Sequence, residues 1–169
     1  MISVRSATDE DGLDVAALLG ATFAEYEGCL FVASEMPELR SLRTAFTGAG
    51  GAFWVAHREV LGVPVLVGCV GYTTKSKRVE LKKLYVAGHE RRSGLGARMV
   101  SMVEEAAMAL GADAVELWSD TRFETAHRFY ERRGYVRTGT TRPLHDASAT
   151  QEYYFEKRLA PNRQRSLSG

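Results

Sequence analysis

The stretch that most constrains the fold is Arg91-Arg92-Ser93-Gly94-Leu95-Gly96, which joins an apolar strand-like run at 79–86 to a long amphipathic helix at 94–110. A glycine-rich turn in this context aims several free backbone N–H groups at one point, and the helix N-terminus adds a partial positive charge there. The two arginines supply further charge-assisted donors. The sequence therefore predicts a binding site for a phosphate or pyrophosphate group.

The balanced charge of the chain indicates that any anion site is confined to one part of the molecule. The net charge is +1, from 22 basic and 21 acidic residues, so the chain lacks the basic field that nucleic-acid binding needs. Residues 1–5 do not show the basic and then apolar pattern of a signal peptide, and no run reaches the roughly 18–20 apolar residues that span a membrane. We therefore expect a cytoplasmic protein without a membrane or nucleic-acid partner. Neither Cys29 nor Cys69 has a second cysteine or a histidine at ligand spacing, so we expect no metal site.

Hydrophobic periodicity predicts alternating helices and strands in one domain over residues 1–159. Helices are expected at 8–26, 37–46, 94–110 and 123–133, and strands at 2–6, 52–58, 65–74, 79–86, 114–118, 135–138 and 152–157. Consecutive strands favour antiparallel pairing, whereas the strand–helix–strand unit at 79–118 favours a parallel crossover. The predicted fold class is α/β (α+β), with a mixed, mostly antiparallel central sheet of six to seven strands flanked by about four helices.

Two segments need separate comment. Gly68 and Gly71 would weaken the strand at 65–74 unless a neighbour packs close to the backbone there. Residues 160–169 are polar and are expected to form a flexible C-terminal tail.

Three kinds of phosphate site fit a glycine-rich turn. A P-loop needs Lys followed by Ser or Thr, but Ala97 and Arg98 follow Gly96. A dinucleotide-binding turn needs a third glycine at position 99, where this chain has Met. The third kind is indicated by a family resemblance.

Residues 91–96 resemble the Arg/Gln-x-x-Gly-x-Gly/Ala signature of the GCN5-related N-acetyltransferase (GNAT) superfamily. Residues 80–86 resemble the strand before that loop, and residues 126–135 resemble the later helix with its Tyr and closing Gly-aromatic pair. The order and spacing of the three blocks agree, so the resemblance covers most of residues 1–159 and implies the GNAT-like fold. Phe123 departs from the pattern, because many members carry an Asn there that sometimes bonds to the cofactor.

The resemblance implies an acetyl-CoA-dependent N-acetyltransferase that moves an acetyl group directly to a primary amine of a small molecule. Two alternatives stay open: a protein acetyltransferase acting on a lysine or an N-terminus, and a non-catalytic CoA-binding regulatory module. Dimers are frequent in this superfamily, which leaves room for a homodimer.

The same resemblance assigns the donor site. Backbone N–H groups of the glycine-rich loop would hold the CoA pyrophosphate, and the preceding strand would pair with the pantetheine arm. The implied cofactor-binding residues are Leu84, Tyr85, Val86, Arg91, Arg92, Ser93, Gly94, Leu95, Gly96 and Ala97. Tyr130 is the expected general acid, because the leaving thiolate needs a proton that a nearby phenol can supply.

Glu80 is the expected general base, because an alkylammonium acceptor must lose a proton before it attacks. On a regular strand Glu80 would share a face with Leu84 and Val86, at about 13 Å from Leu84, so we expect a water relay rather than direct transfer. The alternative is a surface carboxylate paired with Lys82 or Arg78.

The acceptor pocket is expected between residues 25–36 and residues 142–152. Carboxylates in the first segment could favour a cationic amine, and a polar group in the second could contact the substrate, although solvated loops are the alternative. These residues are Glu25, Glu27 and Glu35 in the first segment, and Arg142, His145 and Asp146 in the second. We expect His127 to lie on a polar helix face with no catalytic role.

Overall fold

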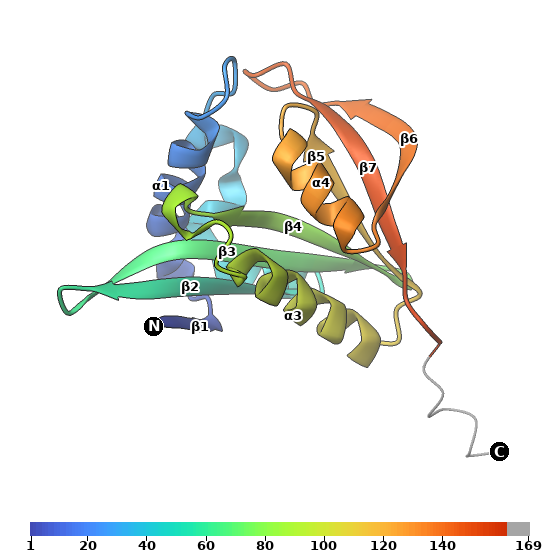
Figure 1. The fold of residues 1–169 in the computed structure, drawn as a ribbon, viewed down its shortest axis with the longest axis horizontal. Helices are drawn as coiled ribbons and strands as arrows, with labels where there is room; N and C mark the ends of the chain where they lie inside the picture. The colour runs from blue at the N-terminus through green and yellow to red at the C-terminus, as the bar shows by residue number, and fades with distance from the viewer. Residues whose placement is uncertain (162–169) are drawn as a thin grey trace.

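The computed structural model describes residues 1–161, so most of the expected tail at 160–169 lies outside the described residues. Seven strands form one sheet in the order β1-β2-β3-β4-β5-β7-β6 (Figure 1). The strands are β1 (Ile2–Ser6), β2 (Ala52–Val60), β3 (Val63–Lys75), β4 (Arg78–Val86), β5 (Ala114–Asp120), β6 (Val136–Pro143) and β7 (Gln151–Arg158). Every neighbouring pair is antiparallel except β4 and β5, which are parallel, as the strand–helix–strand unit predicts.

Within residues 1–161, four α-helices and four short 3-10 helices surround the sheet. The α-helices are α1 (Gly12–Phe23), α2 (Leu42–Gly48), α3 (Leu95–Ala109) and α4 (Glu124–Arg132). The 3-10 helices are η1 (Asp9–Asp11), η2 (Ala33–Glu35), η3 (Pro37–Ser41) and η4 (Gly88–Glu90). A mixed seven-stranded sheet with four α-helices confirms the predicted fold class.

The sheet separates two apolar cores. On one face, α3 and α4 pack over β3, β4, β5 and β7, with Met99, Leu117 and Phe155 fully buried. On the other face, α1, η3 and α2 pack over β2 and β3, with Leu19 and Leu42 fully buried. Figure 1 shows α3 and α4 along one side of the sheet and α1 near the opposite end of the molecule from β7. We refer to the two faces as the α3/α4 face and the α1/α2 face.

Two differences between the observed and the predicted element boundaries are the most informative. The helix expected at 37–46 begins as the 3-10 helix η3 and becomes α-helical only at Leu42. The sequence predicts that a strand begins at residues 135–138 and that a loop begins at Arg142, whereas β6 continues to Pro143. Nearly all of its side chains are exposed, because β6 is an edge strand, so it carries no apolar alternation that could mark its length.

The two glycines of β3 are explained by close packing. A Cβ on Gly71 would lie 2.4 Å from the ring of Phe53 and 2.6 Å from the ring of Phe46. A Cβ on Gly68 would lie 3.0 Å from Leu95, at the start of α3. Both helical layers can therefore approach β3 closely, because these two positions have no side chain. This is the close packing that the sequence analysis required for a strand containing two glycines.

Substituting Gly71 with Ala should lower the free energy of unfolding by about 2 kcal/mol, because the added methyl group overpacks the Phe46 and Phe53 rings. The matched control is Gly48→Ala at the end of α2, where no atom lies within 4 Å of the new Cβ. Chemical denaturation of both variants measures the difference. Equal stability of the two variants would contradict the packing argument.

Candidate active site

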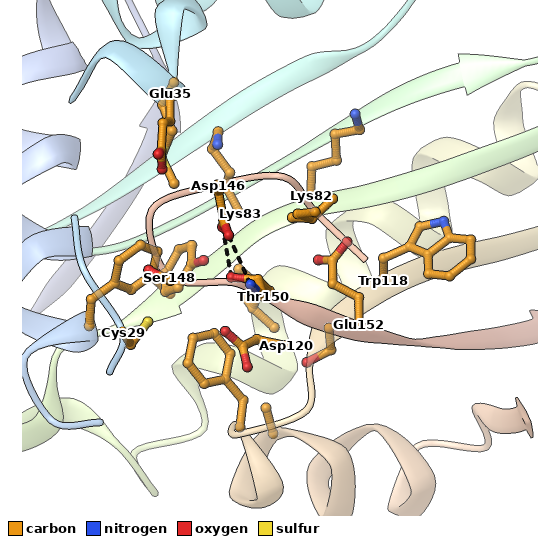
Figure 2. Close-up of a pocket in the computed structure, with 18 of the residues that line it drawn as sticks. Cys29, Glu35, Lys82, Lys83, Trp118, Asp120, Asp146, Ser148, Thr150 and Glu152 are labelled. Atoms are coloured by element: carbon orange, nitrogen blue, oxygen red, sulfur yellow. Dashed lines mark hydrogen bonds between the residues drawn. The ribbon is translucent and has the colours of Figure 1, made fainter. Parts of the chain in front are cut away.

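A break in the pairing of β4 and β5 creates a cavity in the sheet. The two strands pair only from Arg78 to Glu80 and from Ala114 to Glu116. Beyond these residues β4 continues alongside β3, and β5 continues alongside β7. The gap holds a cavity of about 350 Å³, lined by residues of both strands, of α4 and of the loop before β7 (Figure 2).

A β-bulge at Lys83 changes the direction of the side chains along β4. Gly71 pairs with Lys82 and Cys69 pairs with Tyr85, so β4 has one extra residue in this interval. Lys83 has a φ of +53°, and its carbonyl accepts a hydrogen bond from the Cys69 thiol at 3.2 Å. Burial raises the pKa of Cys69 to about 12, so its sulfur stays protonated and can donate. Cys69 is therefore a buried residue of the core that also makes a structural hydrogen bond.

The bulge overturns one expectation about Glu80. Val79 and Leu81 pack on the α3/α4 face before the bulge, and Leu84 and Val86 pack on that same face after it. Glu80 alternates with Val79 and Leu81, so it belongs to the α1/α2 face. The expectation that Glu80 shares a face with Leu84 and Val86 was wrong, because that argument assumed a regular strand.

The ion pairs of β4 also decide where Glu80 finds a counter-charge. Its carboxylate lies 3.8 Å from the ammonium of Lys82, and its side chain is 24% exposed. Arg78 instead pairs with Glu116 and Glu156. Glu80 still lines the cavity, so the loose pair with Lys82 does not remove it from the site.

The glycine-rich loop has the geometry that an anion needs. Arg92 and Gly94 both have left-handed backbone conformations, with φ values of +68° and +86°, and α3 begins immediately afterwards at Leu95. Within residues 1–161, no hydrogen-bond partner is present for the backbone N–H groups of Arg92, Gly94, Gly96 and Ala97. Unpaired N–H groups at the N-terminus of a 15-residue helix form a favourable anion site.

The two arginines of this loop differ in their side-chain contacts. The guanidinium of Arg91 makes two bonds to Glu25, at 2.6 and 2.9 Å, and its Nε donates to the carbonyl of Val86 at 3.2 Å. Arg92 is exposed and forms no ion pair with the described residues. Arg91 therefore fixes the loop to the end of α1, while Arg92 leaves its guanidinium available.

Tyr130 enters the cavity from α4. Its side chain is buried, and its ring packs against Phe129, Tyr135 and Phe155 at centroid distances of 5.5–5.9 Å. Burial raises the pKa of its hydroxyl, so the group is protonated at neutral pH. The hydroxyl has no hydrogen-bond partner in the described part of the chain, although the residue lines the cavity.

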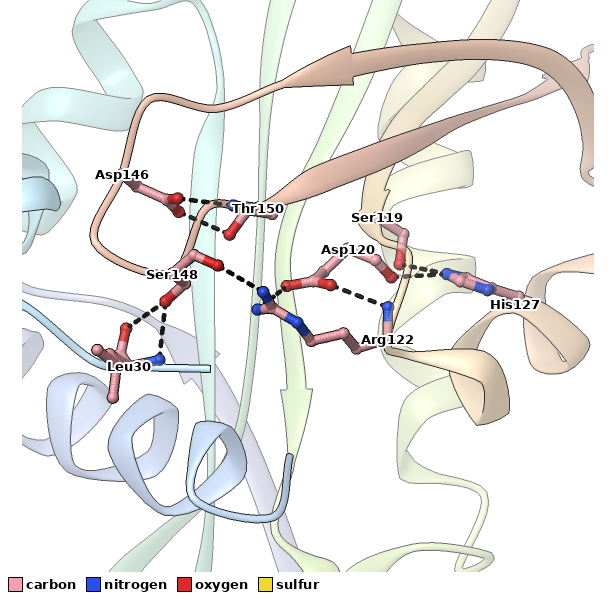
Figure 3. Close-up of polar contacts among 8 residues, drawn as sticks. All are labelled: Leu30, Ser119, Asp120, Arg122, His127, Asp146, Ser148 and Thr150. Carbon is pink, nitrogen blue, oxygen red and sulfur yellow. Dashed lines mark hydrogen bonds and ion pairs between the residues drawn. The ribbon is translucent and has the colours of Figure 1, made fainter. Parts of the chain in front are cut away.

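The two segments expected to form the acceptor side do meet across the cavity (Figure 3). Ser148 accepts a hydrogen bond from the Leu30 N–H at 2.8 Å and donates one to the Leu30 carbonyl at 3.2 Å. Glu35 accepts from the Ala147 N–H at 2.7 Å, and Arg122 donates to the Ser148 carbonyl. These bonds hold residues 144–150 over the cavity, and we call this segment the roof loop.

The predicted acceptor residues divide into two groups. Glu35, Arg142 and Asp146 line the cavity, and both carboxylate oxygens of Asp146 accept hydrogen bonds from Thr150. Glu25, Glu27 and His145 do not line it: Glu25 is paired with Arg91, and the other two are exposed.

Sequence reasoning missed Trp118 and Asp120 on β5, and it gave no role to Glu152 on β7, which is the last residue of the expected acceptor segment 142–152. Asp120 and Glu152 are direct partners in the β5–β7 pair, and both line the cavity (Figure 2). The only available signal was their alternation with the apolar residues Leu117 and Phe155, which places them on the opposite face.

His127 was assigned to the wrong environment. It is only 4% exposed, and its Nε2 lies 2.9 Å from the Asp120 carbonyl and 3.2 Å from the Ser119 hydroxyl. Burial lowers the pKa of the ring, so it is neutral at pH 7 and its role is to hold the end of β5. Phe123, at the family's Asn position, packs its ring against Tyr26 at 4.7 Å and lines the cavity.

The described residues lack two other kinds of site. No group of three or more His, Cys, Asp or Glu side chains within residues 1–161 is arranged to hold a metal ion. No helix in the same range has the length and hydropathy needed to cross a membrane. Cys29 and Cys69 are both free thiols.

Comparison with known proteins identifies the family. Residues 19–135 match the model of the acetyltransferase (GNAT) family, and the chain therefore belongs to this family of acyltransferases. The comparison with curated proteins gives no match.

Similar solved structures agree with this assignment at the level of the fold. A GNAT-family acetyltransferase from Staphylococcus aureus Mu50 has a TM-score of 0.79 at 18% identity, over 95% of this chain and 100% of that one. The PaiA N-acetyltransferase from Thermoplasma acidophilum, in complex with coenzyme A, gives 0.70 at 16% identity, over 94% and 99%. A structure provisionally described as a phosphinothricin N-acetyltransferase has a TM-score of 0.71 at 18% identity, over 95% of this chain and 99% of that one.

A charge placed in the glycine-rich loop tests the anion site. A Cβ at Gly96 would make only ordinary contacts, 3.7–3.9 Å from Phe129 and Val86, so the Gly96→Asp variant should fold. A carboxylate at this position is also stabilised by the partial positive charge of the helix N-terminus. That carboxylate should weaken the binding of CoA by at least about tenfold through like-charge repulsion. Titration calorimetry measures the affinity.

The control for this experiment is Gly96→Asn, which has nearly the same size without the charge. Equal CoA affinity of the Asp and Asn variants would show that the loop does not hold the pyrophosphate.

Proposed function

We propose that this protein is an acetyl-CoA-dependent N-acetyltransferase that acetylates a primary amine of a small molecule by direct transfer. The observation that carries the proposal is the cavity where β4 and β5 part. It has the phenol of Tyr130 on one side and a group of carboxylates on the other. A donor thioester and an amine could meet there from opposite faces of the sheet.

The chain's own groups fit the donor. The free N–H groups of the loop before α3 match a pyrophosphate, and the edge of β4 from Leu81 to Val86 is unpaired on the side of β5. In this proposal, Leu84, Tyr85 and Val86 pair with the pantetheine arm as a strand would. Acetyl-CoA supplies an acetyl group on a thioester, whose carbonyl a backbone N–H of this edge would polarise.

Tyr130 would act on the sulfur that leaves. Because burial raises the pKa of its hydroxyl, the group holds its proton and can donate a hydrogen bond as negative charge develops on the thiolate. Its lack of another partner in the described residues leaves that hydrogen available. This supports the role of Tyr130 as the donor toward the thiolate.

The acceptor side favours a small cationic amine. Six carboxylates line the cavity against three cationic side chains, which attracts an ammonium group. The roof loop covers this side through its bonds to Leu30, Glu35 and Arg122. A covered cavity of about 350 Å³ suits a small molecule better than a folded protein's lysine or N-terminus.

Donor binding is the first part of the test. Acetyl-CoA at about 100 times its Kd should stabilise the protein by about 2.7 kcal/mol in a thermal unfolding experiment. A thiol-release assay over a panel of small amines then separates an enzyme from a CoA-binding regulatory module, and lysine-containing peptides serve as the competing acceptor class. Turnover of peptides alone would favour the protein acetyltransferase.

Tyr130→Phe should lower kcat by about 100-fold and leave the affinity for CoA unchanged, because only a hydroxyl that faces the leaving sulfur is removed. The matched control is Tyr135→Phe, whose hydroxyl donates to Glu104 instead. We expect the control to keep near wild-type turnover. A wild-type kcat for Tyr130→Phe would remove this residue from the mechanism.

A further inference from the structure

Glu152 differs from the other carboxylates of the cavity because it combines an open oxygen with low exposure. Its Oε1 accepts a hydrogen bond from Arg142 Nε at 2.8 Å, and within residues 1–161 its Oε2 has no partner. Its side chain is 13% exposed and lines the cavity (Figure 2). One oxygen is therefore fixed by the protein and the other is available to a ligand.

Most of the other carboxylates of the cavity already accept hydrogen bonds or form ion pairs within the protein. Both oxygens of Asp120 accept bonds from Arg122, and both oxygens of Asp146 accept bonds from Thr150. Glu38 pairs with Lys83 at 2.7 Å and Glu35 accepts from the roof loop, each through one oxygen, but the Glu38 side chain is 30% exposed and Glu35 is exposed. Glu80 is left as the main competitor of Glu152.

Glu80 and Glu152 differ in exposure and in their cationic neighbours. The side chain of Glu80 is 24% exposed, and its partner, the Lys82 ammonium, lies 3.8 Å away. The partner of Glu152 is nearer, with Arg142 Nε at 2.8 Å, and it is oriented because its guanidinium stacks over the Trp118 ring at 4.1 Å. Glu152 is therefore the better-oriented carboxylate.

The surroundings of Glu152 favour uptake of a proton. Burial raises the pKa of Glu152; the Arg142 hydrogen bond opposes this rise, and the charges of Asp120 and Glu80 add to it. Asp120 is its direct partner across β5 and β7. The charged groups that face it are thus Asp120 from β5, Arg142 from β6, and Glu80 with its partner Lys82 from β4.

We propose that Glu152 is the general base that takes the proton from the acceptor ammonium, an inference that rests on the proposed N-acetyltransferase function. Oε2 of Glu152 binds the ammonium and removes one proton, which frees the nitrogen lone pair. The nitrogen attacks the thioester carbon, so a C–N bond forms, the C–S bond breaks, and the electron pair leaves with sulfur. The second N–H proton goes to the thiolate, and the proton on Glu152 returns to solvent.

The pH dependence of kcat/KM for the amine tests this role. A base in the site lets the wild-type enzyme use the abundant ammonium form, so kcat/KM should reach a plateau between the pKa of Glu152 and the pKa of the amine. Glu152→Gln must wait for free amine from solution. Its kcat/KM should therefore be about 100-fold lower at neutral pH and should rise with pH up to the amine's own pKa.

Two variants and one wild-type measurement complete the experiment. Glu80→Gln removes the same charge from the same face and should keep the plateau, with a loss in kcat/KM of less than about tenfold. The lower end of the plateau should move to lower pH, because the charge of Glu80 then no longer raises the pKa of Glu152. Glu152→Asp should also keep the plateau at a reduced rate. In the wild-type enzyme, the lower end of the plateau should stay at one pH for two amines of different pKa, a readout that does not depend on the variants folding.

The possible results separate the two proposals. Wild-type turnover with an unchanged pH profile in Glu152→Gln, or a lower end of the plateau that moves with the pKa of the amine, would overturn the role of Glu152 alone. Failure of every amine to release thiol, in a protein that acetyl-CoA stabilises, would overturn the proposed function and with it the role of Glu152.

Discussion

The short pairing of β4 with β5 is the constraint on which the site depends. Only Arg78–Glu80 and Ala114–Glu116 are in register, and each strand then follows its antiparallel neighbour. The gap is therefore held open by two well-paired halves of the sheet rather than by loops. Backbone groups that face it lack a partner strand, which is costly unless water or a ligand satisfies them. The fold thus presents an extended peptide edge inside the molecule, where a strand-like ligand can complete the sheet.

The bulge at Lys83 divides this gap chemically. Without the extra residue, the side chains before and after it would alternate in one phase, and Glu80 would lie on the face of Leu84 and Val86. With it, apolar side chains of both halves of β4 lie on the α3/α4 face, and Glu80 lies on the α1/α2 face. The Cys69 thiol bonded to the Lys83 carbonyl fixes the position of the change. One face is thereby suited to an apolar arm and the other to a charged acceptor.

Features that depend on residues close together in the sequence could be predicted from it. The glycine-rich loop, α3, the sheet class and the position of Tyr130 follow from local periodicity and turn chemistry, which act over a few residues. The face of Glu80 was not readable, because the bulge in β4 is defined only against Gly71 and Cys69 of β3. The meeting of Asp120 with Glu152 was missed for the same kind of reason, since the order β5-β7-β6 brings together strands that are distant in the chain.

Under the proposed function, the charge and the protonation state of this cavity are linked by the needs of the amine substrate. An acidic lining, with six carboxylates against three cations, binds the ammonium form of an amine most tightly. Only the neutral form has the lone pair that attacks a thioester, so tight binding of the cation by itself would stabilise an unreactive state. The conflict is resolved if one of the carboxylates that attract the cation also has enough proton affinity to deprotonate it. Burial beside Asp120 gives Glu152 that affinity, while Arg142 keeps its carboxylate aimed at the cavity.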